Sequence, residues 1–222
     1  MMRYGFTTGS CAEAAAAAAC YMLLTGRKKE EMTILTPKGI SYTAKLVDIS
    51  INESSAACAI VKDGGDDPDI TTGAHIVAEV AFMKKESLQK ESRQKDKTDA
   101  VQQIIIRGGK GVGRVTKPGL DQPVGEAAIN HVPREMIEKE VRRICALCDY
   151  NGKLQVTISV PEGEEIAQKT FNPRLGITGG ISILGTSGIV EPMSSQALLD
   201  TIQVELRQKN CLLTLKKKKK PL

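Results

Sequence analysis

The fold is decided by the stretch NPRLGITGGISILGTSGIVEPMSS, which runs from Asn172 to Ser195. Its glycines stand among apolar and β-branched residues, and glycine allows close approach of backbones and positive φ angles. The apolar pieces 181–184 and 189–190 predict short, buried strand ends. After Pro192 a serine can cap a helix. Two interpretations stay open: a packed strand–turn–helix corner, or a glycine-rich loop that forms an anion site at a helix N-terminus.

The size and composition are those of a globular protein. The chain has 222 residues, of which 41% are hydrophobic and 26% charged, enough for one large or two small domains. No apolar run approaches the ~18 residues of a membrane span, and no secretory signal pattern begins the chain. These features predict a cytoplasmic protein without a membrane partner.

The net charge of +5 comes from one run. Lys216–Lys220 supplies five of the 31 basic residues, which leaves 26 against 26 acidic ones. Aromatic residues make up 3% and tryptophan is absent, whereas nucleic-acid sites spread basic residues over a face and add stacking rings. Nucleic acid is therefore not an expected partner. A module driven by the lysine run would bind with steep salt dependence and would lose binding when 216–222 are deleted.

The six cysteines do not indicate a disulfide framework in such a chain. Cys145 and Cys148 form one C-x-x-C pair, but a zinc site needs four ligands. The pattern predicts a buried pair on one face of a helix and no metal site.

The first helix is predicted from a capping box and a stop signal. Ser10 and Glu13 fit S-x-x-E, Gly26 fits a C-terminal stop, and Ala14–Ala19 lie between them. A surface of alanines predicts a buried helix. Residues 7–10 would then stand at its positive end, either as a cap alone or as an anion or substrate site.

The remaining elements predict an α+β fold, in which helices pack on a mixed or antiparallel sheet. Alternation and turn signals predict strands at Met32–Thr36, Ile40–Ile51, Ala56–Lys62, Gln103–Arg107 and Leu154–Val160, and helices at Gly73–Met83, at Arg134–Cys148 after Pro133, and at Ser195–Gln208. The last helix carries Leu198, Leu199, Ile202 and Leu206 near one face, which predicts that it docks on the first domain.

Two loops carry charge. Asp63–Asp69 has four carboxylates but departs from the calcium-loop spacing, so it is a solvated turn or a group that accepts ribose hydroxyls or faces a sulfonium. The strand at 104–106 leads into a G-x-G-x-G sequence, but Pro118 disfavours the helix that a dinucleotide site requires. This second loop still offers basic residues for an anion.

Four motifs resemble one family. They are RYGFTTGSCA at Arg3–Ala12, KDGGDDPD at Lys62–Asp69, GGKGVGRVTKPGL at Gly108–Leu120, and the opening stretch. Their order resembles the CbiD family, the cobalt-precorrin-5B C1-methyltransferases of the oxygen-independent route to cobalamin. The resemblance implies S-adenosylmethionine as methyl donor, methylation of C-1 of a cobalt-precorrin, and cobalt-precorrin-6A as product.

Candidate site residues follow from charge and from glycine-rich backbone. A precorrin carries many carboxylates, which suit arginine and lysine. No catalytic residue and no metal ligand is assigned, and a homo-oligomer is left open. The cofactor candidates are Asp66, Asp67, Asp69, Gly179, Gly180, Gly185 and Thr186, and the substrate candidates are Thr7, Thr8, Ser10, Arg107, Arg114, Lys117, Arg134 and Arg174.

The resemblance also implies a longer protein. Family members continue into a second α/β domain, so we expect a truncated or frame-disrupted member, with an inactive remnant that binds at most a tetrapyrrole or the cofactor as the alternative. The expected division is a first domain at 1–193 with a charged insertion at 84–99, a helix at 194–209, and a lysine-rich tail at 210–222 that is disordered or loosely packed.

Overall fold

A computed structural model describes residues 3–83 and 103–192, together with Leu199, Ile202, Gln203, Leu206, Arg207 and Lys209. Its centre is a five-stranded mixed sheet in the order β4-β5-β6-β10-β7. The strands are β4 (Val47–Ile51), β5 (Ser55–Val61), β6 (His75–Phe82), β10 (Leu154–Ser159) and β7 (Ile104–Gly108). All neighbours are antiparallel except β10 and β7, which are parallel. The predicted α+β class is confirmed.

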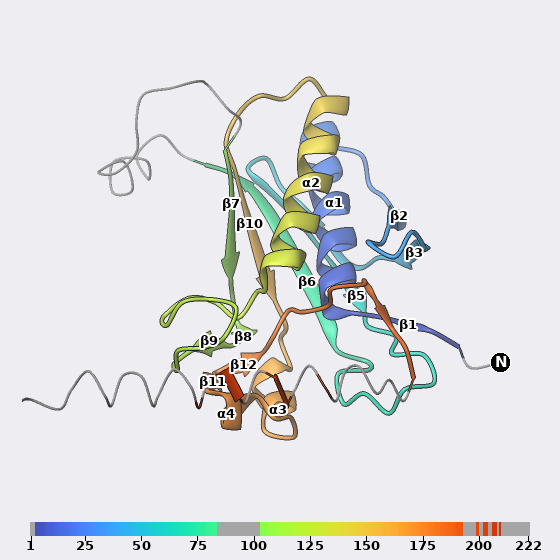
Figure 1. The fold of residues 1–222 in the computed structure, drawn as a ribbon. Coiled ribbons are helices and arrows are strands. Elements are labelled where there is room, and N and C mark those ends of the chain that lie inside the picture. Colours follow the sequence, from blue (N-terminus) through green and yellow to red (C-terminus); the bar gives the residue numbers. More distant parts are fainter. Residues whose placement is uncertain are drawn as a thin grey trace, which may run out of the picture.

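Two long helices pack together on one face of this sheet (Figure 1). They are α1 (Thr8–Thr25), which lies against β5 and β6, and α2 (His131–Leu147), which lies beside α1. Alternate residues of β10, namely Leu154, Val156 and Ile158, are fully buried beneath them. This period of two is that of a strand with one covered face.

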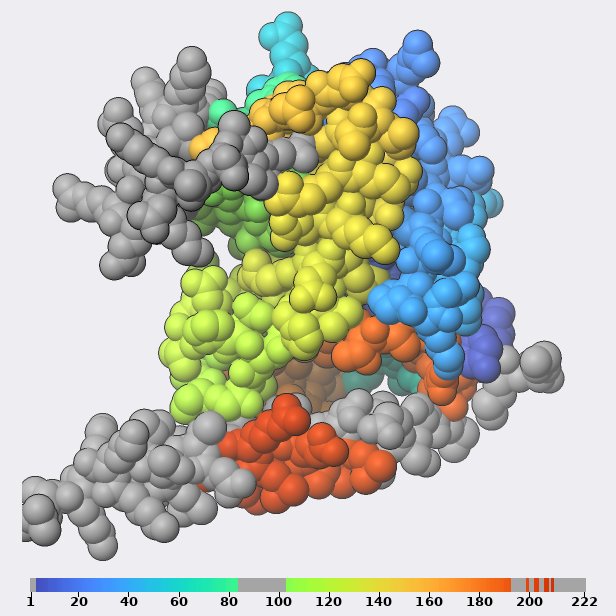
Figure 2. Space-filling view, turned by 45° about the horizontal axis from the view of Figure 1, so that its top comes forward, coloured from blue at the N-terminus to red at the C-terminus, as the bar shows by residue number. Residues whose placement is uncertain are grey.

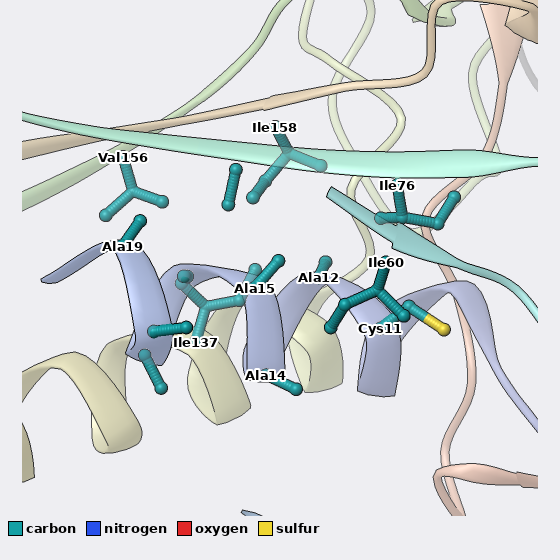
Figure 3. Close-up of a cluster of buried hydrophobic side chains, with 14 of the residues drawn as sticks. Cys11, Ala12, Ala14, Ala15, Ala19, Ile60, Ile76, Ile137, Val156 and Ile158 are labelled. Atoms are coloured by element: carbon teal, nitrogen blue, oxygen red, sulfur yellow. The ribbon is translucent and has the colours of Figure 1, made fainter. Parts of the chain in front are cut away.

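The alanines of α1 allow the helix to sit between the sheet and α2. Ala12, Ala15 and Ala19 project toward the strands and Ala14 toward the opposite side (Figure 3). Every residue from Ala14 to Ala19 has no exposed surface. A side chain of one carbon lets neighbouring backbones approach closely, so the alanine run is explained by packing on two sides.

Short strands form four small two-stranded sheets around this core. The pairs are β1 (Gly5–Phe6) with β13 (Ile189–Val190), β2 (Glu31–Leu35) with β3 (Ser41–Lys45), β8 (Gly111–Val112) with β12 (Gly180–Ile181), and β9 (Arg114–Val115) with β11 (Ile177–Thr178). Two short helices, α3 (Gly163–Ala167) and α4 (Asn172–Leu175), complete the fold. The hairpin β2–β3 stands apart from the five-stranded sheet, contrary to the prediction of one sheet.

The region Gly73–Met83 contains the strand β6 (His75–Phe82) and not the predicted helix. Ile76, Ala78 and Val80 are fully buried and alternate with more exposed residues such as Glu79, which is the period of a strand. Its central position in the sheet, paired with β5 and β10 on its two sides, fixes this conformation.

The start of α1 also differs from the prediction. Its N-cap is Thr7, whose Oγ1 accepts from the Ser10 amide at 3.2 Å, so the predicted box formed by Ser10 and Glu13 is wrong. Gly26 does end the helix, in the left-handed conformation. Ser10 Oγ instead donates to the Gly188 carbonyl at 2.7 Å.

Cys145 and Cys148 are not a buried pair on one helix face. Cys148 is the C-cap of α2 and is half-buried, whereas Cys145 is buried with its Sγ 3.9 Å from Cys20 Sγ of α1. The helix starts at His131, three residues before the predicted Arg134, with Asn130 as its N-cap.

The segment after Pro192 is described at six positions, all helical. Leu199, Ile202 and Leu206 are each about half exposed, so their burial against the first domain is not seen. Leu198, the serines proposed as caps, the insertion at 84–99 and the tail at 210–222 lie outside the described residues. Among the described residues, no helix combines the length and apolar character that a membrane crossing requires.

Candidate functional site

The opening stretch wraps around the N-terminus of α1. Thr8 Oγ1 accepts from the Leu184 amide at 2.9 Å and lies within hydrogen-bond distance of the Ser182 and Leu184 carbonyls. The Gly9 amide donates to the Leu184 carbonyl at 3.0 Å. The amides of Gly9, Ser10 and Cys11 in the first turn of α1 thus have protein acceptors, which favours the interpretation of this end as a cap.

Close backbone contacts bring the four motifs together. A Cβ on Gly5 would lie 2.1 Å from the carbonyl carbon of Gly64, and one on Gly180 would lie 2.1 Å from the Gly111 oxygen. These positions therefore need glycine for steric reasons. On the surface, the segment that ends in β13 passes beside the β2–β3 hairpin (Figure 2), where the Lys38 amide donates to the Ser187 carbonyl.

A hollow of about 270 Å³ lies where three of the motifs meet, and we name it the smaller hollow. Polar side chains at its wall come from α1, from the loop after β5 and from the opening stretch. Its lining residues are Thr7, Thr8, Lys62, Asp69, Thr71, Thr170, Phe171, Asn172, Leu175, Ile181, Ser182, Leu184 and Val190.

A buried ion pair forms part of this wall. The Lys62 side chain is 1% exposed, and its Nζ lies 2.7 Å from Asp69 Oδ2. Asp69 Oδ1 accepts from the amide and the hydroxyl of Thr71 at 2.8 and 2.7 Å. Burial alone would raise the pKa of Asp69, but the Lys62 ammonium and the Thr71 bonds outweigh it and lower the pKa below its usual value. A charged pair is thus fixed beside the cavity.

We expect Asp69→Asn to lower the free energy of unfolding by about 3 kcal/mol, because it leaves the Lys62 ammonium buried without its counter-charge. Replacing both residues by apolar ones, Lys62→Met with Asp69→Leu, should restore most of the loss. Urea unfolding followed by circular dichroism measures both. Glu138→Gln, which breaks the exposed pair with Arg142, is the control and should cost less than about 1 kcal/mol. If Asp69→Asn and Glu138→Gln lowered the free energy of unfolding equally, the Lys62–Asp69 pair would not be a buried ion pair in solution.

A larger hollow of about 570 Å³ adjoins the first. Asn172, Leu175, Ser182 and Leu184 line both hollows and form a shared wall. Ser182 Oγ donates to Asn172 Oδ1 at 3.4 Å across this wall. The remaining residues of the larger hollow are Val115, Gly119, Leu120, Asp121, Gln122, Ala128, Asn130, Ile177 and Arg207.

An acid and a histidine meet at the edge of the larger hollow. The two oxygens of Asp121 bind His131 twice, through the backbone amide and through ring Nδ1, each at 2.6 Å. Burial alone would raise the pKa of Asp121, but hydrogen bonds from Gln122 and His131 lower it overall. The carboxylate therefore orients the ring at the start of α2.

The structure divides the predicted site residues into groups. Thr7, Thr8 and Asp69 line the smaller hollow. Arg107, Arg114 and Arg134 line a third hollow elsewhere. Lys117 Nζ donates to the Arg174 carbonyl, next in the chain to Leu175 of the shared wall.

The other predicted residues take part in backbone packing or lie at the surface. Ser10 and Gly185 pack around the α1 terminus, and a Cβ on Gly185 would lie 2.3 Å from Thr7 Oγ1. Asp66 Oδ2 accepts from the Arg3 amide at 2.7 Å. Asp67, Gly179, Gly180 and Thr186 do not line the smaller or the larger hollow among the described residues.

Sequence reasoning missed Lys62, Asn172, Ser182 and Asp121. Lys62 had a signal, because a lysine that ends an apolar strand directly before a carboxylate run can pair with one of those carboxylates. Asn172 and Ser182 had none beyond their place in the opening stretch. The pairing of Asp121 with His131 depends on the path of the loop between them.

Comparison with known proteins agrees with the resemblance. The sequence model of the CbiD family matches residues 1–192. A relative from Ruminiclostridium cellulolyticum named cobalt-precorrin-5B C(1)-methyltransferase is 50% identical over 208 residues, covering 94% of this chain and 50% of the relative. One of the same name from Geobacillus kaustophilus is 50% identical over 196 residues, covering 88% and 48%.

A solved structure is also similar. The crystal structure of the cobalamin biosynthesis protein CbiD from Archaeoglobus fulgidus superposes with a TM-score of 0.61 at 29% identity, over 91% of this chain and 59% of that one. The chain spans about half the length of the curated relatives it matches. On the match over residues 1–192, the chain belongs to the CbiD family.

Proposed function

We propose that this chain provides the part of a cobalt-precorrin-5B C1-methyltransferase that holds S-adenosylmethionine beside its tetrapyrrole. The reaction is transfer of a methyl group from the sulfonium to C-1 of cobalt-precorrin-5B, which gives cobalt-precorrin-6A. The names of the relatives and the family match support this proposal. The observation that carries it is the pair of adjoining hollows with one shared wall.

Methyl transfer needs two ligands in contact and no covalent enzyme intermediate. The methyl carbon must lie in line between the sulfur and the attacking carbon, and water must be excluded. Two hollows that share Asn172, Ser182 and Leu184 would hold the two ligands side by side, and the transfer requires the sulfonium methyl to reach C-1 directly, past the edge of these side chains.

We assign the smaller hollow to S-adenosylmethionine. Asp69 can accept hydrogen bonds from hydroxyls or face a sulfonium charge, and Thr7, Thr8 and Thr71 offer hydroxyls. Phe171 gives an aromatic face for a purine ring.

We assign the larger hollow to the tetrapyrrole. Leu120, Leu175 and Ile177 offer an apolar surface for the macrocycle. Cationic groups for its carboxylates are Arg207 at the wall and Lys117 and Arg174 beside it.

Calorimetry with S-adenosylhomocysteine tests the assignment. The wild-type chain should bind it, and Phe171→Ala should weaken binding by roughly 10-fold, the loss of one aromatic contact of about 1–1.5 kcal/mol. Phe171 is 61% exposed, so its removal should leave stability almost unchanged. Leu147→Ala, at a residue 69% exposed on α2, is the matched control and should bind as wild type.

The competing hypothesis is a remnant without activity. No heat from this chain, with clear heat from the full-length Ruminiclostridium cellulolyticum relative, would favour the remnant. Binding without methylation of cobalt-precorrin-5B would show that the ligand sites are present and that the reaction needs residues outside this chain.

A further inference from the structure

Three arginines from three elements line a third hollow of about 250 Å³, which we name the arginine pocket. Arg107 comes from β7, Arg114 from β9 and Arg134 from the first turn of α2. The one acidic residue at its wall is Glu126 among the described residues. Three guanidinium groups and one carboxylate thus lie at one wall, and Asp121 also acts on Arg134 from outside the lining.

The arginine pocket is separate from the two hollows of the proposed methylation site. None of its lining residues in the described part of the chain lines either of them. Arg114 and Ala127 line the arginine pocket, whereas their neighbours Val115 and Ala128 line the larger hollow. Successive residues of an extended chain point to opposite sides, so β9 and the segment paired with it form a wall between the two cavities.

Main-chain carbonyls hold two of the arginines in place. Arg134 donates through Nε to Ile129 O at 2.9 Å and through Nη1 to Ile106 O at 3.1 Å. Arg114 donates through Nη1 to Gly125 O at 3.0 Å. Carbonyl acceptors orient a guanidinium but do not cancel its charge, so both side chains keep a full positive charge at the pocket.

The third arginine, Arg107, is oriented by a side chain of the neighbouring strand β10. Arg107 Nε donates to Gln155 Oε1 at 3.2 Å, a neutral acceptor on β10. Burial lowers the pKa of the Arg134 guanidinium, whereas the charges of Glu126 and Asp121 raise it. A partly desolvated cation binds an anion more strongly than a solvated one does.

We propose that the arginine pocket binds a small dianion, a phosphate monoester or a short dicarboxylate, independently of the methylation site. Guanidinium groups pair with phosphate and carboxylate through two parallel hydrogen bonds, and a dianion can pair with Arg114 and Arg134 at once. A cavity of about 250 Å³ admits such a group together with some water. The proposal does not depend on the proposed methyltransferase activity.

Calorimetry at constant ionic strength tests this with inorganic phosphate, succinate and acetate. The wild-type chain should bind phosphate or succinate at one site, and acetate at least about 10-fold more weakly. Phosphate alone would indicate a phosphate ester as the natural ligand, and succinate alone a dicarboxylate. Arg114→Gln should weaken the binding of the dianion by about 10-fold or more, because it removes one charge-assisted hydrogen bond.

Arg27→Gln is the matched control, because Arg27 is exposed beyond the end of α1 and the substitution removes the same charge. It should bind the dianion as wild type does. Failure of the wild type to bind either dianion, or an equal loss in Arg27→Gln, would overturn the proposal. S-adenosylhomocysteine binding should be unchanged in Arg114→Gln; if it falls in parallel, the pocket belongs to the methylation site and its independence is wrong.

Discussion

Gly111→Ala is expected to lower the free energy of unfolding by at least about 4 kcal/mol, in the range reserved for severe steric defects. Gly111 has φ +72°, and a Cβ there would lie 1.8 Å from Val160 O and 2.8 Å from Val160 C. Both are backbone atoms, so no side-chain rotation relieves the overlap. Gly111 also pairs with Gly180, so its displacement separates β8 from β12. Urea unfolding of purified protein, or loss of soluble protein on expression, measures the effect.

Gly39→Ala separates this clash from the cost of the backbone conformation. Gly39 has φ +79°, nearly that of Gly111, but a Cβ there would meet nothing within 4 Å. Its substitution should cost about 1–2 kcal/mol, the penalty of the left-handed region. If Gly111→Ala costs no more than Gly39→Ala, the close contact between Gly111 and the Val160 carbonyl is not tight in solution.

Compared with wild type, the Glu13→Gln variant is expected to gain stability as the pH rises. Glu13 is 3% exposed between α1 and α2, and its Oε2 has no hydrogen-bond partner among the described residues. Burial, with a smaller effect of Glu140, raises its pKa to about 8, against a lowering by Lys139. The native carboxyl therefore keeps its proton at pH 7, whereas the unfolded chain, with the ordinary pKa of 4.5, has lost it.

The direction of the effect follows from the proton count. Between pH 4.5 and 8 the native state binds more protons than the unfolded state, so the free energy of unfolding falls as pH rises, by about 1.4 kcal/mol per pH unit. Below pH 4.5 both states are protonated and the stability is fully present. Glutamine does not titrate, so the stability of Glu13→Gln relative to wild type should rise by on the order of 4 kcal/mol from pH 5 to pH 9.

Urea unfolding at several pH values measures this difference. Glu135→Gln, at an exposed position of α2, is the control and should run parallel to wild type. Parallel curves for Glu13→Gln and wild type would mean that the carboxyl is solvated or paired and that its environment has been misassigned.

The fold could be predicted where a pattern was local. The alanine run, the alternation in β10 and the stop at Gly26 each reflect a short-range rule, and each agrees with the structure. The prediction was wrong for 73–83, because GAHIVAEVAFM has apolar residues at both helical and strand spacings. Pairing with β5 and β10 decides between them, and strand partners distant in sequence cannot be read from a single segment.

The motifs indicate which segments meet at the candidate site, but they do not show how its residues are distributed among three separate hollows. The charges of Arg107 and Arg174 look alike in the sequence, and only the path of β9 shows that one lies at the arginine pocket and the other near the shared wall. The spacing of Cys145 and Cys148 did not predict the thiol that lies beside Cys145 for a related reason, since that thiol belongs to Cys20 on another helix. Spacing along the chain identifies neighbours on one element and not contacts between elements.

The way in which α1 is completed has a consequence for synthesis on the ribosome. Thr8 and Ser10 bond to Leu184 and Gly188, which lie 176 and 178 positions later in the chain. At typical translation rates these partners leave the ribosome roughly 10 to 35 seconds after the helix itself. During that interval β5, β6 and then α2 (His131–Leu147) are made and cover the alanine-rich helix in turn, but its N-terminal turn still lacks the segment that completes it. We therefore expect the nascent chain to engage a chaperone most strongly before α2 has been made and to be released once the opening stretch completes α1, and ribosome profiling of chaperone-bound nascent chains would show both stages.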